Sequence, residues 1–182
     1  MREHIEAEFQ RIDLADYTRL TAFYNDNGAL GCAMSHLKAL SCDEIKTDRL
    51  LMVCEDDCAF VADRRQLDHL IEKFFLDDRL DVLCLAYNAR NGIRVSDDFS
   101  ITSNTQTMSC YVIKSWMQQP LADSMAESSL GLQNGLSKWR SACDIVWKER
   151  QKSSFFVIPI DRAACQTPSF SDIEKEEVNY GV

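Results

Sequence analysis

The chain has 182 residues, of which 46% are hydrophobic, and its formal net charge is −9. This length is typical of one domain that buries a real core, so the composition excludes a disordered tail or a small binding peptide. The acidic charge argues against a nucleic-acid partner, because proteins that bind a phosphate backbone need a cationic face. An acidic chain that handled an anionic nucleotide would need to bring its own divalent cation.

The sequence contains eight cysteines, and most of them lie in apolar runs. This pattern favours buried reduced thiols over a disulfide framework. Cys54 and Cys58 flank an acidic triplet, but without a second thiol pair or a spaced histidine pair they make a poor zinc site. No run approaches the roughly 18 apolar residues of a membrane span, and the N-terminus is charged. We therefore expect a soluble cytoplasmic protein without a transmembrane segment, either free or peripheral to a membrane.

The first part of the chain predicts two amphipathic helices. Apolar residues recur at helical spacing over residues 5–12 and again over 30–40. Between these helices, residues 17–23 predict a short strand and residues 25–28 a turn.

A continuous apolar run follows at residues 50–54, and it is bounded by charged residues. Such a run suits a strand that is covered on both faces, as in a parallel sheet. An amphipathic helix over 67–75 and a second apolar run at 82–86 come next. Together these segments predict a βαβ unit.

The rest of the chain continues to alternate between strands and helices. Polar residues 89–106 predict a long surface loop or an irregular hairpin. The other predicted elements are a strand at 108–113, a helix at 116–125 that Pro120 interrupts early, a flexible segment at 128–135, a helix at 139–150 and a strand at 155–160. We therefore expect one α/β domain over residues 1–182, an αβα sandwich with a mostly parallel central sheet.

The most informative residues are Glu55, Asp56 and Asp57, which directly follow the buried strand at 50–54. Ligands of open α/β sheets bind outside the carboxyl ends of the strands. In an extended segment Glu55 and Asp57 point to the same side, so their oxygens can meet one metal ion. The alternative is a solvated turn, in which the acids cap the next helix and favour its dipole.

Two segments carry a resemblance to a known family. Residues 28–40 contain Gly-Ala-Leu-Gly-Cys-Ala-Met-Ser-His, and residues 51–57 read Leu-Met-Val-Cys-Glu-Asp-Asp. This order resembles glycosyltransferase family 25, which includes lipopolysaccharide and collagen galactosyltransferases. In that family a Gly-x-x-Gly-Cys-x-x-Ser-His helix precedes a strand that ends in Glu-Asp-Asp. Residues 107–113, 143–147 and 166–173 resemble the family more weakly, so the resemblance covers almost the whole chain.

The resemblance implies a GT-A fold and a metal-dependent, inverting glycosyltransferase. The donor would be a nucleoside-diphosphate sugar, with galactose among the candidates, and the acceptor a saccharide, another glycan or a lipid-linked saccharide. Glu55 and Asp57 would bind Mn²⁺ or Mg²⁺, and Asp144 is the candidate catalytic base. The implied donor-binding residues are Gly31, Ser35, His36, Glu55, Asp56, Gln166 and Asp172.

Each of these residues also has a structural interpretation. Asp144 also fits an exposed, solvated acid on a helix, and His36 a partly buried histidine that hydrogen-bonds to a backbone carbonyl. Gly31 suits a helix end, and Ser171 with Asp172 suits a helix N-cap before residues 174–178.

Two further protein classes compete with an active enzyme. A phosphorylation receiver domain would need an aspartate after the run at 82–86, which instead is followed by Tyr87 and Asn88. The stronger rival is a catalytically inactive glycosyltransferase-like binding or scaffold module, since the family's opening strand has no counterpart before Met1. A sheet without that strand would have an unpaired edge, which makes a homodimer worth testing.

Overall fold

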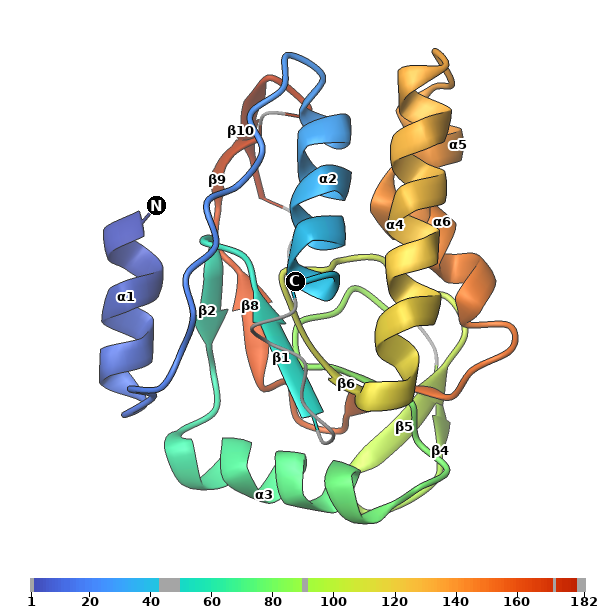
Figure 1. Cartoon of the computed structure of the whole chain (residues 1–182). Helices are drawn as coiled ribbons and strands as arrows, with labels where there is room; N and C mark the ends of the chain where they lie inside the picture. The colour runs from blue at the N-terminus through green and yellow to red at the C-terminus, as the bar shows by residue number, and fades with distance from the viewer. Residues whose placement is uncertain (1, 43–49, 90–91, 172, 180–182) are drawn as a thin grey trace.

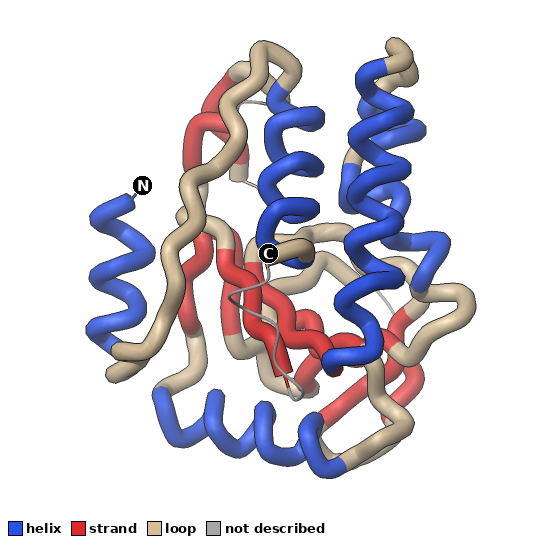
Figure 2. The backbone as a smooth tube through the Cα atoms, viewed as in Figure 1, coloured by secondary structure: helices blue, strands red, loops and turns tan. Residues whose placement is uncertain are grey.

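The computed structural model describes residues 2–42, 50–89, 92–171 and 173–179. These residues form a six-stranded sheet with helices on both faces (Figures 1 and 2). The strands lie in the order β1-β6-β3-β7-β5-β4. Their bounds are β1 Leu50–Cys54, β3 Val82–Cys84, β4 Ile93–Arg94, β5 Phe99–Thr102, β6 Cys110–Lys114 and β7 Phe156–Pro159. The expected α/β class is therefore confirmed.

The expectation of a mostly parallel sheet is wrong. Only β3 and β7 pair in parallel, and the other neighbouring strands of this sheet are antiparallel. The strand β6 lies between β1 and β3 and runs opposite to both, so the expected βαβ unit has its two strands parallel but not adjacent. A strand that is buried on both faces has the same continuous apolar pattern in either direction, so the sequence could not distinguish them.

Two helical layers bury the two faces of the sheet (Figure 1). The helices α2 Gly28–Leu40, α4 Gln118–Gln133, α5 Lys138–Ser141 and α6 Cys143–Arg150 belong to one side, and α1 Arg2–Arg11 and α3 Arg64–Leu76 to the other. Each face of the sheet has its own apolar core. Successive residues of β6 show this, because Tyr111 packs in the core beneath α2, α4 and α6, and Val112 in the core that includes α1 and α3. This alternation is the period of two that a strand imposes.

The helix α4 corrects two expectations. Pro120 does not interrupt it, and residues 128–133 continue the helix as part of Gln118–Gln133. Pro120 lies in the first turn, where its missing N–H has no intrahelical acceptor, so the ring is tolerated. The short 3₁₀ turn η2 Ser115–Met117 leads into this helix. The helix expected over 139–150 is divided into α5 and α6 at Ala142, whose ψ of 149° is extended.

Residues 17–23 do not form the expected strand. They belong to an irregular segment, residues 14–25, which passes along α2. The backbone N–H of Phe23 donates to Ser35 Oγ at 2.9 Å, and Lys38 Nζ donates to the Thr21 carbonyl at 3.0 Å. Gly31 allows this approach, since a Cβ there would lie 2.8 Å from the Phe23 carbonyl oxygen. The segment is therefore fixed by side chains of a helix and not by a strand ladder.

Smaller ladders complete the fold. The strand β2 Cys58–Phe60 pairs with β8 Ala164–Gln166, and β9 Ser169–Ser171 pairs with β10 Glu176–Val178. The polar stretch at 89–106 contains the antiparallel pair β4 and β5, so the hairpin interpretation is confirmed. Among the described residues, no helix is both long enough and apolar enough to cross a membrane.

Candidate functional site

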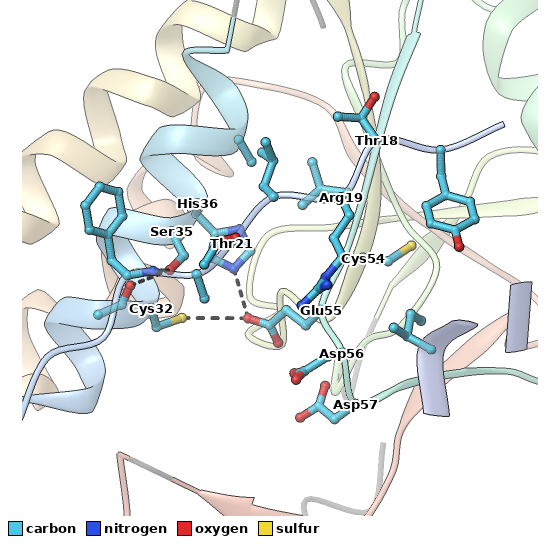
Figure 3. Close-up of a pocket in the computed structure, with 18 of the residues that line it drawn as sticks. Thr18, Arg19, Thr21, Cys32, Ser35, His36, Cys54, Glu55, Asp56 and Asp57 are labelled. Carbon is cyan, nitrogen blue, oxygen red and sulfur yellow. Dashed lines mark hydrogen bonds and ion pairs between the residues drawn. The ribbon is translucent and has the colours of Figure 1, made fainter. Parts of the chain in front are cut away.

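A cleft of about 910 Å³ opens beside β1. Its walls are β1, the helix α2 and the irregular segment 14–25, and the acidic triplet lies at its end (Figure 3). Gln166 and Ser171 also line it. The volume falls in the range of small-molecule sites, roughly 300–1,000 Å³.

The acidic triplet forms the turn between β1 and β2. The backbone N–H of Glu55 donates to the Ser109 carbonyl at 2.8 Å, which prolongs the pairing of β1 with the chain before β6. The backbone N–H of Cys58 then donates to the Glu55 carbonyl at 3.3 Å and reverses the chain. Glu55, Asp56 and Asp57 therefore all line the cleft from one tight turn, as Figure 3 shows.

Glu55 lies in a buried polar network. Its Oε1 is 2.9 Å from His36 Nε2, and it also accepts from Cys32 Sγ at 3.7 Å. His36 Nδ1 is 3.1 Å from the Tyr111 hydroxyl, and Cys32 Sγ is 3.5 Å from Cys143 Sγ. His36 is thus satisfied by side chains and not by the backbone carbonyl of its structural interpretation.

The network changes the protonation of its members. Burial alone would lower the pKa of His36, but hydrogen bonds to Cys32 and Glu55 outweigh it and raise the pKa to about 10. Burial alone would raise the pKa of Glu55, but the hydrogen bond from His36 outweighs it and lowers the pKa. At neutral pH the two side chains form an imidazolium–carboxylate ion pair.

Asp57 is the most unusual acid of the triplet. Its side chain is buried, with 8% exposed, and Oδ2 accepts from Gln166 Nε2 at 2.7 Å. Its Oδ1 is also buried, yet among the described residues it has no hydrogen-bond partner. Burial raises the pKa of Asp57 to about 7, and the negative charges of Glu55 and Asp56 add to the rise. Buried carboxylate oxygens normally accept a hydrogen bond or bind a cation, so this oxygen is a candidate ligand.

The donor set fits a hard divalent cation at Asp57. Carboxylate oxygens are the ligands that Mg²⁺ and similar ions prefer, and a cation would relieve the repulsion among the three acids. Glu55 is less available as a metal ligand, because its Oε1 already accepts a hydrogen bond from His36. Cys32, His36 and Glu55 also place ligand atoms within 4.8 Å of one another, but these atoms already serve as each other's hydrogen-bond partners.

The other predicted site residues have different positions relative to Asp57. Gln166 is brought to Asp57 by the pairing of β8 with β2. Gly31 and Ser35 line the cleft, but their visible role is to hold the Phe23 backbone. Asp172 lies outside the described residues.

Asp144 lies on α6 and is not among the residues that line the cleft. Its Oδ2 accepts from Gln106 Nε2 at 3.1 Å. Burial raises its pKa, and the charge of Glu55 contributes to the rise. The two carboxylates are therefore electrostatically linked although they do not share the cleft.

Sequence reasoning missed several residues of the site. Tyr111 on β6 hydrogen-bonds to His36, and Cys143 on α6 contacts Cys32 through its sulfur. Arg19 lines the cleft from the irregular segment (Figure 3). Periodicity carries no signal for these contacts, because each joins elements that are distant in the chain.

The fold and the site together define an α/β protein with a carboxylate-lined cleft at the end of an edge strand. No protein-family model matches this chain, and a search of curated proteins found no match.

Proposed function

We propose that this chain is a metal-dependent glycosyltransferase of the GT-A type, which transfers a sugar from a nucleoside-diphosphate sugar to a saccharide or other glycan. One observation carries the proposal. Asp57 Oδ1 is buried in an acidic turn at the end of a strand, inside a cleft of about 910 Å³, and no residue in the described part of the chain hydrogen-bonds to it. In open α/β sheets ligands bind outside the carboxyl ends of parallel strands, and β1 runs in the same direction as β3 and β7.

In this proposal Asp57, with help from Glu55, holds Mn²⁺ or Mg²⁺. The bound ion would supply Lewis-acid neutralisation of charge on the leaving nucleoside diphosphate. Gln166 fixes the Asp57 carboxylate by donating to Oδ2, and His36 keeps Glu55 ionised. The protein thus orients both carboxyl groups before any ion arrives.

The remaining cleft residues would bind the donor. Arg19 supplies a cation to the wall that faces β1, and Asp56 supplies an exposed carboxylate that suits sugar hydroxyls. Gly31 and Ser35 would act indirectly, by holding the segment that carries Arg19.

Asp144 is the proposed base for the acceptor hydroxyl. Burial raises its pKa in the direction that improves a general base near neutral pH. Because Asp144 does not line the cleft, this role requires the acceptor to approach from the side of α6. Galactose as the sugar, a lipid-linked acceptor, a homodimer and a cytoplasmic place at the membrane periphery are further parts of the proposal.

A second candidate is a catalytically inactive glycosyltransferase-like binding or scaffold module. It is favoured by the contact between His36 and Glu55, which engages one of the two proposed metal ligands. It is also favoured by the position of β1 at the sheet edge, beside a segment that does not continue the sheet. This module would bind a ligand in the cleft without turnover.

Calorimetric titration with nucleoside diphosphates, with and without Mn²⁺, tests the proposal. We expect Mn²⁺-dependent binding to the wild-type protein and a loss of about 100-fold or more in Asp57→Asn, since even outer-shell changes weaken metal sites 10–100-fold. Asp97→Asn is the matched control, because Asp97 is fully exposed on the β4–β5 hairpin.

Hydrolysis of a panel of nucleotide sugars then separates the two candidates. Turnover that requires both Mn²⁺ and Asp57 supports the enzyme. Binding without turnover on any donor or acceptor supports the inactive module. A wild-type protein that binds no nucleotide with or without Mn²⁺ removes the active enzyme.

A further inference from the structure

Three cysteine thiols meet behind the acidic turn, and we call them the thiol cluster: Cys54, Cys58 and Cys110. Cys54 ends β1 and stands directly opposite Cys110, the first residue of β6, in the antiparallel ladder. Cys58 begins β2, immediately after the turn. The sulfurs of Cys54 and Cys110 are 3.4 Å apart, and all three sulfurs lie within 4.8 Å of one another.

The thiol cluster is buried in the core on one side and borders the cleft on the other. Cys58 and Cys110 are fully buried in the core that also contains Phe60 and Val112. Cys54 is partly exposed and lines the cleft, so a small ion can reach the cluster there. Cys84 is equally buried on β3, but it belongs to neither group of metal-ligating side chains among the described residues.

We propose that the thiol cluster binds one thiophilic ion, Cu(I), in a three-coordinate sulfur site. With metal–sulfur bonds of about 2.3 Å, the length known for zinc thiolates, a trigonal site separates its sulfurs by about 4 Å. The sulfurs of Cys54, Cys58 and Cys110 already lie near that separation.

The ligand chemistry selects the ion. Thiolates are soft ligands that favour Cu(I) and Zn²⁺ over oxygen-seeking ions. Protein sites for structural Zn²⁺ are almost always four-coordinate. Within the described part of the chain, no further cysteine, histidine or carboxylate joins this group, so three-coordinate Cu(I) fits better. Each thiol that ligates releases its proton to solvent, and no electrons are exchanged.

The thiol cluster is separate from the acidic site in front of it. Asp57 offers oxygen to a hard ion, whereas the cluster offers only sulfur to a soft one. An ion at the cluster would join β1, β2 and β6 at the base of the turn that carries Glu55, Asp56 and Asp57. The inference does not depend on the proposed glycosyltransferase activity.

The test is an anaerobic titration of the reduced full chain with Cu(I) in competition with a chromophoric chelator. We expect one tightly bound ion per chain, and weakening by about 100-fold or more in Cys110→Ser and in Cys58→Ser, because each change removes a ligand. Cys84→Ser is the matched buried control and should bind as the wild type does. Cys32→Ser should also bind normally, which separates the cluster from the group of Cys32, His36 and Glu55.

Several results would overturn the proposal. Unchanged affinity in a folded Cys110→Ser variant is one, and loss of binding in Cys32→Ser alone is another. Tighter binding of Zn²⁺ than of Cu(I) would exclude the three-coordinate assignment. A Cys54–Cys110 disulfide that persists in the reduced preparation, seen by mass spectrometry, would also exclude a three-thiolate site. Near-ultraviolet circular dichroism checks that each variant is folded. If the buried hydroxyl of Cys110→Ser prevents folding, Cys110→Ala takes its place.

Discussion

Three adjacent acids have three different environments, and the difference decides their chemistry. Glu55 forms an ion pair with His36, Asp56 is exposed, and Asp57 is buried with one oxygen that meets no hydrogen-bond partner in residues 2–42, 50–89, 92–171 and 173–179. The three side chains share the same turn, so their charge alone does not distinguish them. What distinguishes them is which neighbouring element each one meets.

Asp57 should destabilise the metal-free fold above neutral pH. The pKa of Asp57 rises from 3.8 to about 7 on folding, so the folded state favours the protonated carboxyl group. The stabilisation that comes with this proton is fully present below about pH 4 and is lost as the pH rises through 7. Asp57→Asn cannot ionise, and without metal we expect it to exceed the wild-type free energy of unfolding at pH 8 by about 1–4 kcal/mol, at 1.36 kcal/mol per pKa unit. Urea denaturation from pH 4 to pH 8 measures this difference.

The control for this comparison is Asp97→Asn, a change at a fully exposed side chain, which should stay within about 0.5 kcal/mol of the wild type. Adding Mn²⁺ at pH 8 should stabilise the wild type and leave Asp57→Asn unchanged. If Asp57→Asn is instead the less stable protein at pH 8, the unpartnered oxygen is not a source of destabilisation.

At the level of elements, α2 and the irregular segment form one wall of the cleft. Gly31 and Ser35 are four residues apart and so lie on the same helix face, where they receive the Phe23 backbone. The helix was evident from its apolar spacing. The use of its polar face as a support for residues 14–25 was not, since the sequence predicted a strand there.

Gly31→Ala should release this segment. The added methyl group would lie 2.8 Å from the Phe23 carbonyl oxygen, and we expect a loss of about 1–3 kcal/mol from overpacking, partly offset by the higher helix propensity of alanine. Trypsin should then cleave faster after Arg19, and the cleavage rate is the measurement.

Gly131→Ala is the matched control, because its methyl group would crowd Ser141 and not the segment. It should lower the overall stability without selective cleavage at Arg19. Equal cleavage of the Gly31→Ala and wild-type proteins would mean that Gly31 does not hold the segment.

At the level of the whole molecule, the sheet separates two apolar cores, and aromatic side chains join its strands to the helices above them. Trp147 on α6 is fully buried and packs edge-on against Tyr111 and Phe156. Its Nε1 donates to the Thr105 carbonyl at 3.0 Å. Tyr111 in turn supports His36, so core packing and the site are physically continuous.

Trp147→Ala should therefore lower the free energy of unfolding much more than the same change at Trp139. We expect a loss of about 3–5 kcal/mol at Trp147, where a large cavity would remain, and within about 0.5 kcal/mol at Trp139, which is 73% exposed. Urea denaturation followed by circular dichroism measures both values. Similar losses in the two variants would contradict the assignment of the core.

The sequence by itself determined most of the local elements and the place of the acidic triplet. The helix over Gly28–Leu40 and the strand over Leu50–Cys54 follow from apolar spacing, which is a property of neighbouring residues. The position of Glu55, Asp56 and Asp57 at a strand end follows from the same pattern. The metal and sugar-nucleotide roles of these residues stay predictions.

Only the tertiary structure decided the direction of the strands and the partners of the site residues. Insertion of β6 between β1 and β3 made the sheet mostly antiparallel, and it brought Cys110 to Cys54 and Tyr111 to His36. These contacts join residues more than fifty positions apart in the chain. Periodicity reports which face of an element is buried, but not which element covers it, because that depends on how the whole chain packs.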